Sequence, residues 1–177
     1  MAVRKLFSSI LKKYIKIKKK LLERRFSNMN ENQQKAVFNV NGPVIVLAGA
    51  GSGKTTAIIN RIVNMVDYGD AYTHEESGGE ITEEKLNILE NAYNSGAGAE
   101  SVKTIISHNT VAPWNILAIT FTNKAAGELK ERLSLALGSR GEKVWASTFH
   151  SLCSRILRID ADKLGYSNHF VVYDEDD

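Results

Sequence analysis

The sequence lacks the features that mark secreted and membrane proteins. Its 177 residues hold a single cysteine, Cys153, which excludes an internal disulfide and favours a reducing compartment. No apolar run approaches the roughly 20 residues that a membrane-spanning helix needs. Lysines interrupt the apolar stretches near the N-terminus, so a secretory signal is not expected. These absences predict a cytoplasmic protein without a transmembrane segment, and the length suffices for one domain with a hydrophobic core.

Charge is distributed unevenly along the chain. The net charge is +3, but residues 1–25 carry ten Lys or Arg residues and one acid, Glu23, so this segment alone is +9. The remainder holds 13 basic and 19 acidic residues and is therefore −6. Apolar residues of the basic segment recur at alternating steps of four and three, namely Val3, Phe7, Ile10, Tyr14, Ile17 and Leu21. This spacing predicts a basic amphipathic helix over 1–25.

Two interpretations of that helix stay open. Its apolar stripe packs on the rest of the domain or frays in solvent, or else the helix binds nucleic acid, a membrane or a partner protein.

Strands and helices alternate along most of the remaining chain. Apolar runs predict buried strands over 44–48, 116–121, 144–147 and 170–173. Helices are predicted over 30–39 with Asn30 as the cap, over 54–66, after the second strand, and over 150–163. The inward faces of the last two are expected to hold Ala125, Leu129, Leu133 and Ala136, and Leu152, Cys153, Ile156 and Leu157. The alternation predicts an α/β fold in which a parallel sheet carries helices on both faces.

Residues 67–110 differ in character from the segments around them. They hold nine acids and two bases, with one plausible helix over 82–93. Compact α/β units join their elements with shorter loops. We therefore expect an acidic insertion over about 67–110 that is partly mobile and whose removal leaves the core folded.

The strongest local signal is the glycine-rich segment 48–55, which lies between a predicted strand and a predicted helix. Glycines let the backbone turn tightly and point its N–H groups at phosphate oxygens. Lys54 is expected to reach the β and γ phosphates of a nucleotide, and the Thr55 hydroxyl is expected to ligate Mg²⁺. The predicted nucleoside triphosphate site consists of Ala48, Gly49, Ala50, Gly51, Ser52, Gly53, Lys54 and Thr55.

Three segments besides the glycine-rich one narrow the choice among P-loop proteins. The chain reads MNENQQKAV at 29–37, VLAGAGSGKT at 46–55, ILAITFTNKAA at 116–126 and STFHSLCSRILR at 147–158. In this order the segments resemble the Q motif and motifs I, Ia and Ib of superfamily 1 helicases of the UvrD/PcrA/Rep family. The resemblance implies that residues 26–177 are part of a RecA-like P-loop NTPase domain, incomplete in this chain, which uses ATP and Mg²⁺.

The resemblance also implies a role for individual residues. Gln33 is expected to pair with the adenine edge, and Thr56 lies beside the nucleotide where close relatives often carry Arg. Phe121 is expected to stack on a base of single-stranded DNA, although without the resemblance a core position explains it better. Polar DNA contacts are expected from Thr122, Asn123, Lys124, Thr148, His150 and Ser151. Gly127 is a second departure, because relatives often carry Arg there.

The end of the chain carries a Walker B-like pattern, FVVYDE at 170–175. Asp176 and Asp177 follow, whereas the family continues with an apolar or aromatic residue and then Gln-Asp. We therefore interpret 170–173 as the strand that follows motif Ib, and we expect the chain to stop before Walker B. With no Walker B pair the isolated chain is expected to be inactive.

The resemblance implies the ATP-binding part of a 3′-to-5′ DNA helicase or translocase that acts on single-stranded DNA and duplex junctions. The alternative is a P-loop module that binds nucleotide or DNA without hydrolysis. The strand 44–48 is expected to lack a neighbour on one side, which predicts self-association as well.

Overall fold

The computed structural model describes residues 2–75, 81–167 and 169–171. The chain divides into two compact units, Met1–Pro113 and Trp114–Asp177. Among the described residues, no helix is both long and apolar enough to cross a membrane.

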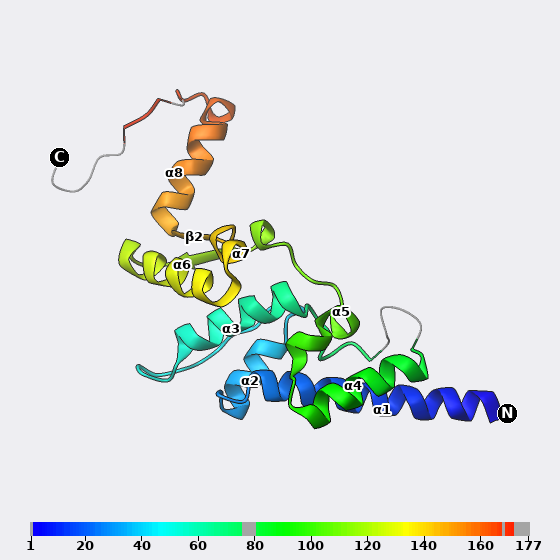
Figure 1. The fold of residues 1–177 in the computed structure, drawn as a ribbon. Helices are drawn as coiled ribbons and strands as arrows, with labels where there is room; N and C mark the ends of the chain where they lie inside the picture. The colour runs from blue at the N-terminus through cyan, green and yellow to red at the C-terminus, as the bar shows by residue number, and fades with distance from the viewer. Residues whose placement is uncertain (1, 76–80, 168, 172–177) are drawn as a thin grey trace. The chain divides into compact units, whose positions relative to one another are not determined.

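Helices dominate the first unit. They are α1 (Ala2–Arg25), α2 (Glu31–Phe38), α3 (Lys54–Asp67), α4 (Glu83–Ser95), the 3-10 helix η1 (Ala99–Val102) and α5 (Lys103–Ile106) (Figure 1). The predicted cap of α2 is confirmed, because the Asn30 side chain accepts from Gln33 N and the Gln33 side chain accepts from Asn30 N. Thr82 caps α4, because its side chain accepts from Lys85 N. The four longer helices match the sequence predictions to within a few residues.

Aromatic side chains join three of these helices. Phe26, directly after α1, contacts Phe38 of α2 edge-on at a centroid distance of 5.6 Å. It also contacts Tyr68, which follows α3, at 6.3 Å. All three residues are buried. Tyr72 extends the cluster by stacking on Phe38 at 3.9 Å. Edge-on and stacked aromatic pairs add roughly 0.5–1.5 kcal/mol each beyond their buried area.

The apolar stripe of α1 is buried against the segment 81–106. Tyr14, Leu21 and Leu22 of α1 are buried, and α1 and α4 lie side by side. The opposing buried residues are Leu86, Leu89 and Ala92 of α4, Ala99 and Val102 of η1, and Ile106 of α5. Tyr14 also donates from its hydroxyl to Ile105 O at 2.8 Å. The packing interpretation of the N-terminal helix is thus confirmed.

The described part of 67–110 is therefore packed on α1 rather than mobile, whereas the expectation that the core folds without this segment stays a prediction. Its acidic composition concealed a buried apolar face whose partner, α1, ends 58 residues before α4 begins. Deleting 70–108 would remove that partner surface and leave the stripe of α1 exposed to water.

Both ends of this segment meet at one point. Asp70 N donates to His108 O at 3.0 Å, and His108 N donates to Tyr68 O at 3.1 Å. Gly69 has a φ of +63°, and a Cβ there would lie 1.9 Å from His108 O, so only glycine fits. The two ends of the segment 70–108 are thus joined by backbone hydrogen bonds.

A buried lysine ties α1 to the same region. The Lys18 ammonium donates to His74 O at 2.8 Å, and the residue is almost fully buried. Burial lowers the Lys18 pKa to about 8, with the neighbouring positive charge of Lys19 adding to the effect.

The predicted strand 44–48 does not form. No backbone hydrogen bond joins residues 44–47 to another described segment, and no strand is assigned there. Ile45 and Leu47 are 86% and 93% exposed. An apolar run predicts burial, but a strand also needs a neighbouring strand to pair its N–H and C=O groups. The described residues supply no such neighbour to this segment.

The second unit contains a parallel two-stranded sheet. Strands β1 (Leu117–Thr120) and β2 (Trp145–Thr148) pair in register from Leu117–Trp145 to Thr120–Thr148. Between them lie α6 (Asn123–Leu137) and the short α7 (Ser139–Glu142). The 3-10 helix η2 (Pro113–Asn115) precedes β1, and α8 (Phe149–Asp160) and η3 (Ala161–Leu164) follow β2. The α/β class and the parallel pairing are as predicted.

Helix α6 contacts both strands. Its buried side chains are Ala126, Leu129, Leu133 and Leu137. Leu129 and Leu133 were predicted to be buried, whereas the predicted Ala125 is half-buried and Ala136 is exposed. The buried stripe therefore starts at Ala126 instead of Ala125 and ends at Leu137 instead of Ala136.

The predicted inward face of α8 is only partly correct. Leu152 is buried and Cys153 is half-buried, but Ile156 and Leu157 are exposed. The helix leaves the sheet after its first turns, so its later apolar residues have no described surface to cover. The predicted strand 170–173 is not found at 170 and 171, and its other two residues lie outside the described part of the chain.

Replacing Leu89 tests the packing of α4. Leu89→Ala removes a fully buried side chain and should lower the free energy of unfolding by about 2–5 kcal/mol. The neighbouring Ile88 is exposed, so Ile88→Ala should cost less than about 1 kcal/mol. Urea unfolding of both variants measures the difference. Equal effects would show that α4 does not pack on α1.

Candidate functional site

The glycine-rich loop wraps around its own lysine. Gly51 and Gly53 have positive φ values of 72° and 79°, which side chains disfavour. Lys54 begins α3, and its ammonium donates to Ala48 O at 3.0 Å and Gly49 O at 2.6 Å. Ser52 donates from its hydroxyl to Gly49 O at 2.7 Å. The loop therefore curls so that a positive charge and the N-terminus of a 14-residue helix meet at one point.

Such an arrangement suits a phosphate group. The first N–H groups of a helix have no partner inside the helix and carry a partial positive charge. Lys54 and Thr55 are exposed in the first turn of α3, so the ammonium and the hydroxyl are both accessible to a ligand. The predicted residues Ala48 to Thr56 are thus adjacent in space as well as in sequence.

Gln33 lies against this loop. Its Nε2 donates to Ser52 O at 2.9 Å, while its Oε1 accepts from Asn30 N at 3.1 Å. A Cβ on Gly53 would lie only 2.6 Å from Gln33 Nε2. The structure therefore brings Gln33 together with the loop, although the two are separated by about twenty residues in sequence.

The contact between α2 and α3 sets this placement. Arg61 of α3 donates from Nη1 to Ala36 O and Asn39 O at the end of α2. Buried Asn64 donates from Nδ2 to Val37 O at 3.3 Å and to Gly69 O at 3.1 Å. Polar side chains of α3 thus cap the C-terminus of α2, and sequence reasoning missed them because neither belongs to the glycine-rich motif.

A pocket of about 210 Å³ opens between α2 and the loop. Its lining includes Gln33 and Lys54, and otherwise consists of Asn30, Asn32, Ala36, Val46, Leu47, Ala48, Ser52, Gly53 and Ala57. Amide and apolar side chains can contact a flat heterocycle, while Lys54 lies on the phosphate side. No acidic residue lines the pocket among the described residues.

The second group of predicted site residues gathers at one edge of the sheet. Because β1 and β2 are parallel and Thr120 pairs with Thr148, their carboxyl ends are adjacent. Phe121 follows β1 and is 94% exposed, so the core interpretation of this aromatic is wrong. Asn123 and Lys124, at the start of α6, are also exposed.

Two threonines at this edge act as helix caps. Thr122 accepts from Ala125 N at 3.1 Å and keeps its own hydroxyl proton available for a ligand. Thr148 accepts from Ser151 N at 3.2 Å, but it is buried and donates to the Ser151 hydroxyl at 2.9 Å. Ser151, which is exposed, is therefore the better phosphate donor of this pair.

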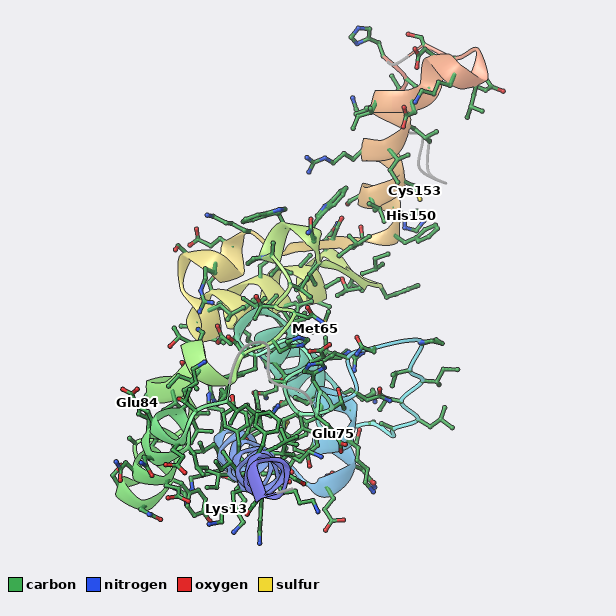
Figure 2. The ribbon with its side chains drawn as sticks, turned by 90° about the vertical axis from the view of Figure 1, so that its right-hand side faces the viewer. Lys13, Met65, Glu75, Glu84, His150 and Cys153 are labelled. Carbon is green, nitrogen blue, oxygen red and sulfur yellow. The ribbon has the colours of Figure 1, made fainter. Side chains whose placement is uncertain are left out.

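His150 lies in the first turn of α8, ahead of Cys153 (Figure 2). Phe149 contacts its ring edge-on at 6.4 Å and is 61% exposed. Sequence reasoning did not select Phe149, yet its position after β2 corresponds to that of Phe121 after β1. The sheet edge thus presents two exposed aromatic rings among polar groups and two helix N-termini.

A third cluster, remote from the loop in sequence, has the residue types of a metal site. Asp70, His74 and His108 place ligand atoms within 4.8 Å of one another. The two imidazole rings are stacked at 3.6 Å and are nearly parallel, so their in-plane lone pairs do not converge. Asp70 Oδ1 already lies 2.5 Å from His108 Nδ1. We assign this cluster to holding the ends of 70–108 together.

Comparison with known proteins identifies the family. The model of the UvrD/REP helicase N-terminal domain matches residues 29–76 and 99–177. The chain belongs to the UvrD/REP helicase N-terminal domain family. The resemblance drawn from the four motifs is thereby confirmed, and so is the RecA-like P-loop fold class.

Curated relatives in the UvrD/REP family are called ATP-dependent DNA helicase PcrA. Those of Staphylococcus aureus and Bacillus subtilis are 37% and 39% identical over 151 residues. That of Staphylococcus epidermidis is 37% identical over 150 residues. Each match covers 85% of this chain, and the chain spans only 15% of the length of each relative.

The UvrD/REP match includes both groups of site residues and omits two structural elements. Gln33, the glycine-rich loop, β1 and β2 all lie within the matched residues. The match skips 77–98, which holds α4, and begins after α1. The two helices that bury one another's apolar faces are thus both outside the family's common domain.

Proposed function

We propose that this chain is the ATP-binding part of an ATP-dependent DNA helicase that moves 3′ to 5′ along single-stranded DNA. The observation that carries the proposal is the loop of Lys54 with Gln33 hydrogen-bonded to Ser52 O, in a chain of the UvrD/REP family. Displacement of strands from duplexes with a 3′ or a 5′ tail, measured with a longer protein that includes this chain, tests the direction. Strand displacement from 5′-tailed duplexes alone would contradict it.

At the nucleotide, each residue has a distinct role in this proposal. Lys54 neutralises the β and γ phosphates, backbone N–H groups of residues 49–55 bind their oxygens, and the Thr55 hydroxyl ligates Mg²⁺. Gln33 exchanges its two bonds, to Asn30 N and Ser52 O, for a donor and an acceptor on the adenine edge. Thr56, which is exposed, lies at the nucleotide side without the charge that an arginine would bring.

At the sheet edge, single-stranded DNA is the proposed ligand. Phe121 and Phe149 provide faces for stacked bases, which any base sequence can use. Donors for phosphates come from the ammonium of Lys124, the amide of Asn123 and the hydroxyls of Thr122 and Ser151. His150 is available for a base or the backbone. Action at duplex junctions and a cytoplasmic location complete the proposal.

The alternative, binding without hydrolysis, is favoured for the isolated chain by one observation. ATP hydrolysis in P-loop enzymes uses one acid to hold Mg²⁺ and another group to position water. No acid lines the pocket at Lys54 among the described residues. We propose that the isolated chain binds ATP and hydrolyses it very slowly.

Replacing Lys54 tests the nucleotide site. A lost charge-assisted hydrogen bond costs roughly 1.5–3 kcal/mol, so Lys54→Ala should weaken ATP binding by at least about tenfold in calorimetry. Lys130→Ala, an exposed lysine on α6, serves as the control and should bind normally. Steady-state turnover of the unaltered chain should stay well under about 1 s⁻¹ even with DNA. Equal ATP affinity of both variants would contradict the site, and fast turnover would contradict the inactivity.

Replacing Phe121 tests the DNA edge. Stacking of a base on an aromatic ring contributes about 1–3 kcal/mol, so Phe121→Ala should weaken binding of a single-stranded oligonucleotide by about 5- to 150-fold in fluorescence anisotropy. Leu135→Ala serves as the control, because it removes a side chain that is also exposed (81%) but lies on α6. Unchanged affinity in Phe121→Ala, with normal folding by circular dichroism, would remove Phe121 from the interface.

Self-association is the last part of the proposal, supported by the exposed segment 44–47. Ile45 and Leu47 are two positions apart in sequence, the spacing of one face of a strand. Segments with unpaired backbone groups and exposed apolar residues tend to pair with another chain. Light scattering at micromolar concentration should show species larger than a monomer. Ile45→Lys with Leu47→Lys should reduce them, whereas Leu135→Lys with Leu164→Lys should not. A monodisperse monomer in the unaltered chain would contradict this part.

A further inference from the structure

Helix α1 has one side that packs inside the first unit and an outward side on which four exposed lysines lie. Tyr14, Leu21 and Leu22 lie on the packed side. The opposite side, here named the basic face, consists of exposed Lys12, Lys13, Lys16 and Lys20. Figure 2 looks along α1 and shows Lys13 pointing outward from the helix. We propose that the basic face of α1 binds the phosphate backbone of DNA.

Other cations of α1 whose side chains the structure describes already have partners. Lys19 lies 3.7 Å from Glu75, and Arg25 lies 3.3 Å from Glu100. Arg24 donates to Tyr93 O at 2.8 Å. Lys12, Lys13 and Lys16 have no ion pair within the described ranges of the chain. Lys20 Nζ lies over the Tyr93 ring, 5.3 Å from the ring centroid. Lys12, Lys13 and Lys16 are therefore the part of the basic face whose charge the described residues leave unneutralised.

The nearest acid of α1 does not relieve this charge. Glu23 accepts a hydrogen bond from the Tyr72 hydroxyl at 2.7 Å. It follows Lys20 by three residues but lies seven or more residues beyond Lys12, Lys13 and Lys16. Lys12 and Lys16, and Lys16 and Lys20, are like charges four residues apart, a spacing that destabilises a helix by a few tenths of a kcal/mol per pair. A polyanion laid along the basic face removes this repulsion.

The dimensions of the basic face fit a nucleic-acid strand. The eight helical steps from Lys12 to Lys20 span roughly 12 Å. Phosphates follow one another at about 3.4 Å per strand along the axis of duplex DNA. The face therefore reaches about three or four phosphates of one strand.

A membrane surface fits the same helix less well. Helices that lie in a membrane interface bury an apolar side in the lipid. The apolar residues Tyr14, Leu21 and Leu22 of α1 are already covered by the protein. Among the described side chains of α1, Phe7 is the one large apolar residue that is exposed. A purely cationic outer face instead matches a phosphate backbone, which is bound by charge without regard to sequence.

This proposal goes beyond the function proposed above. The basic face lies before residue 29 and hence outside the residues that match the UvrD/REP domain. It requires neither the ATP site nor the aromatic residues at the sheet edge.

The test replaces Lys12, Lys13 and Lys16 together by Gln in the full chain. Anisotropy titrations with a labelled duplex and a labelled single strand are run between 50 and 200 mM salt. Loss of three phosphate contacts should lower the slope of log affinity against log salt by about 2–3 on the duplex. Across that salt range, the unaltered chain should therefore lose about 40-fold more affinity than the variant.

A matched control replaces three exposed lysines elsewhere, Lys35, Lys130 and Lys143, by Gln. This variant has the same net charge and should keep the salt slope of the unaltered chain. Thermal melts of both triple variants separate an effect on binding from an effect on folding. A double variant, Lys12→Glu with Lys16→Glu, serves the same purpose. The Phe121→Ala variant should retain the full salt slope, so failure at the sheet edge and failure at α1 are distinguishable.

Three results would overturn the proposal. One is an unchanged salt slope in the folded Lys12, Lys13 and Lys16 variant, and another is an equal fall in the control. The third is binding of α1 to phosphatidylserine vesicles, lost in the same variant, while DNA affinity is unaffected.

Discussion

The contact of Phe26 with Phe38 and Tyr68 is the constraint on which the first unit depends. It fixes the end of α1, the end of α2 and the end of α3 to one another. Because Gln33 is one turn into α2 and Lys54 is the first residue of α3, this cluster also determines which side chains meet at the glycine-rich loop. The residues of the proposed nucleotide site are therefore held in place from the far ends of their own helices.

The loop itself is held by short-range bonds that a ligand can replace. Lys54 and Ser52 donate to carbonyls only three to six residues away, and Gln33 supplies a single bond from outside. A neutral hydrogen bond contributes about 1 kcal/mol net, and one donated by the Lys54 ammonium contributes roughly 1.5–3 kcal/mol. A triphosphate offers stronger, charged acceptors to the same donors. The free energy needed to open the loop is therefore small compared with that gained from the hydrogen bonds to the ligand.

Local chemistry made much of this structure predictable. The cap at Asn30, the glycine-rich loop, the helices and the pairing of 117–120 with 145–148 follow from residue types and spacing, and the motifs directed attention to both groups of site residues. Errors arose where an outcome depends on a distant partner. The segment 44–48 has the composition of a buried strand but no described neighbour, and α4 is acidic in sequence yet buries Leu89 against α1. Phe149 was overlooked because aromatic residues after a strand are more often core.

The mutual burial of α1 and α4 restricts how this chain can have arisen. Both helices lie outside the residues that match the family domain. A gene that acquired the codons for α4 first would encode a helix with Leu86 and Leu89 facing water, and one that acquired α1 first would expose Leu21 and Leu22. Either ancestor carries an aggregation-prone surface. The two additions, although separated by the whole glycine-rich loop in sequence, are therefore expected to be inherited or lost as a pair.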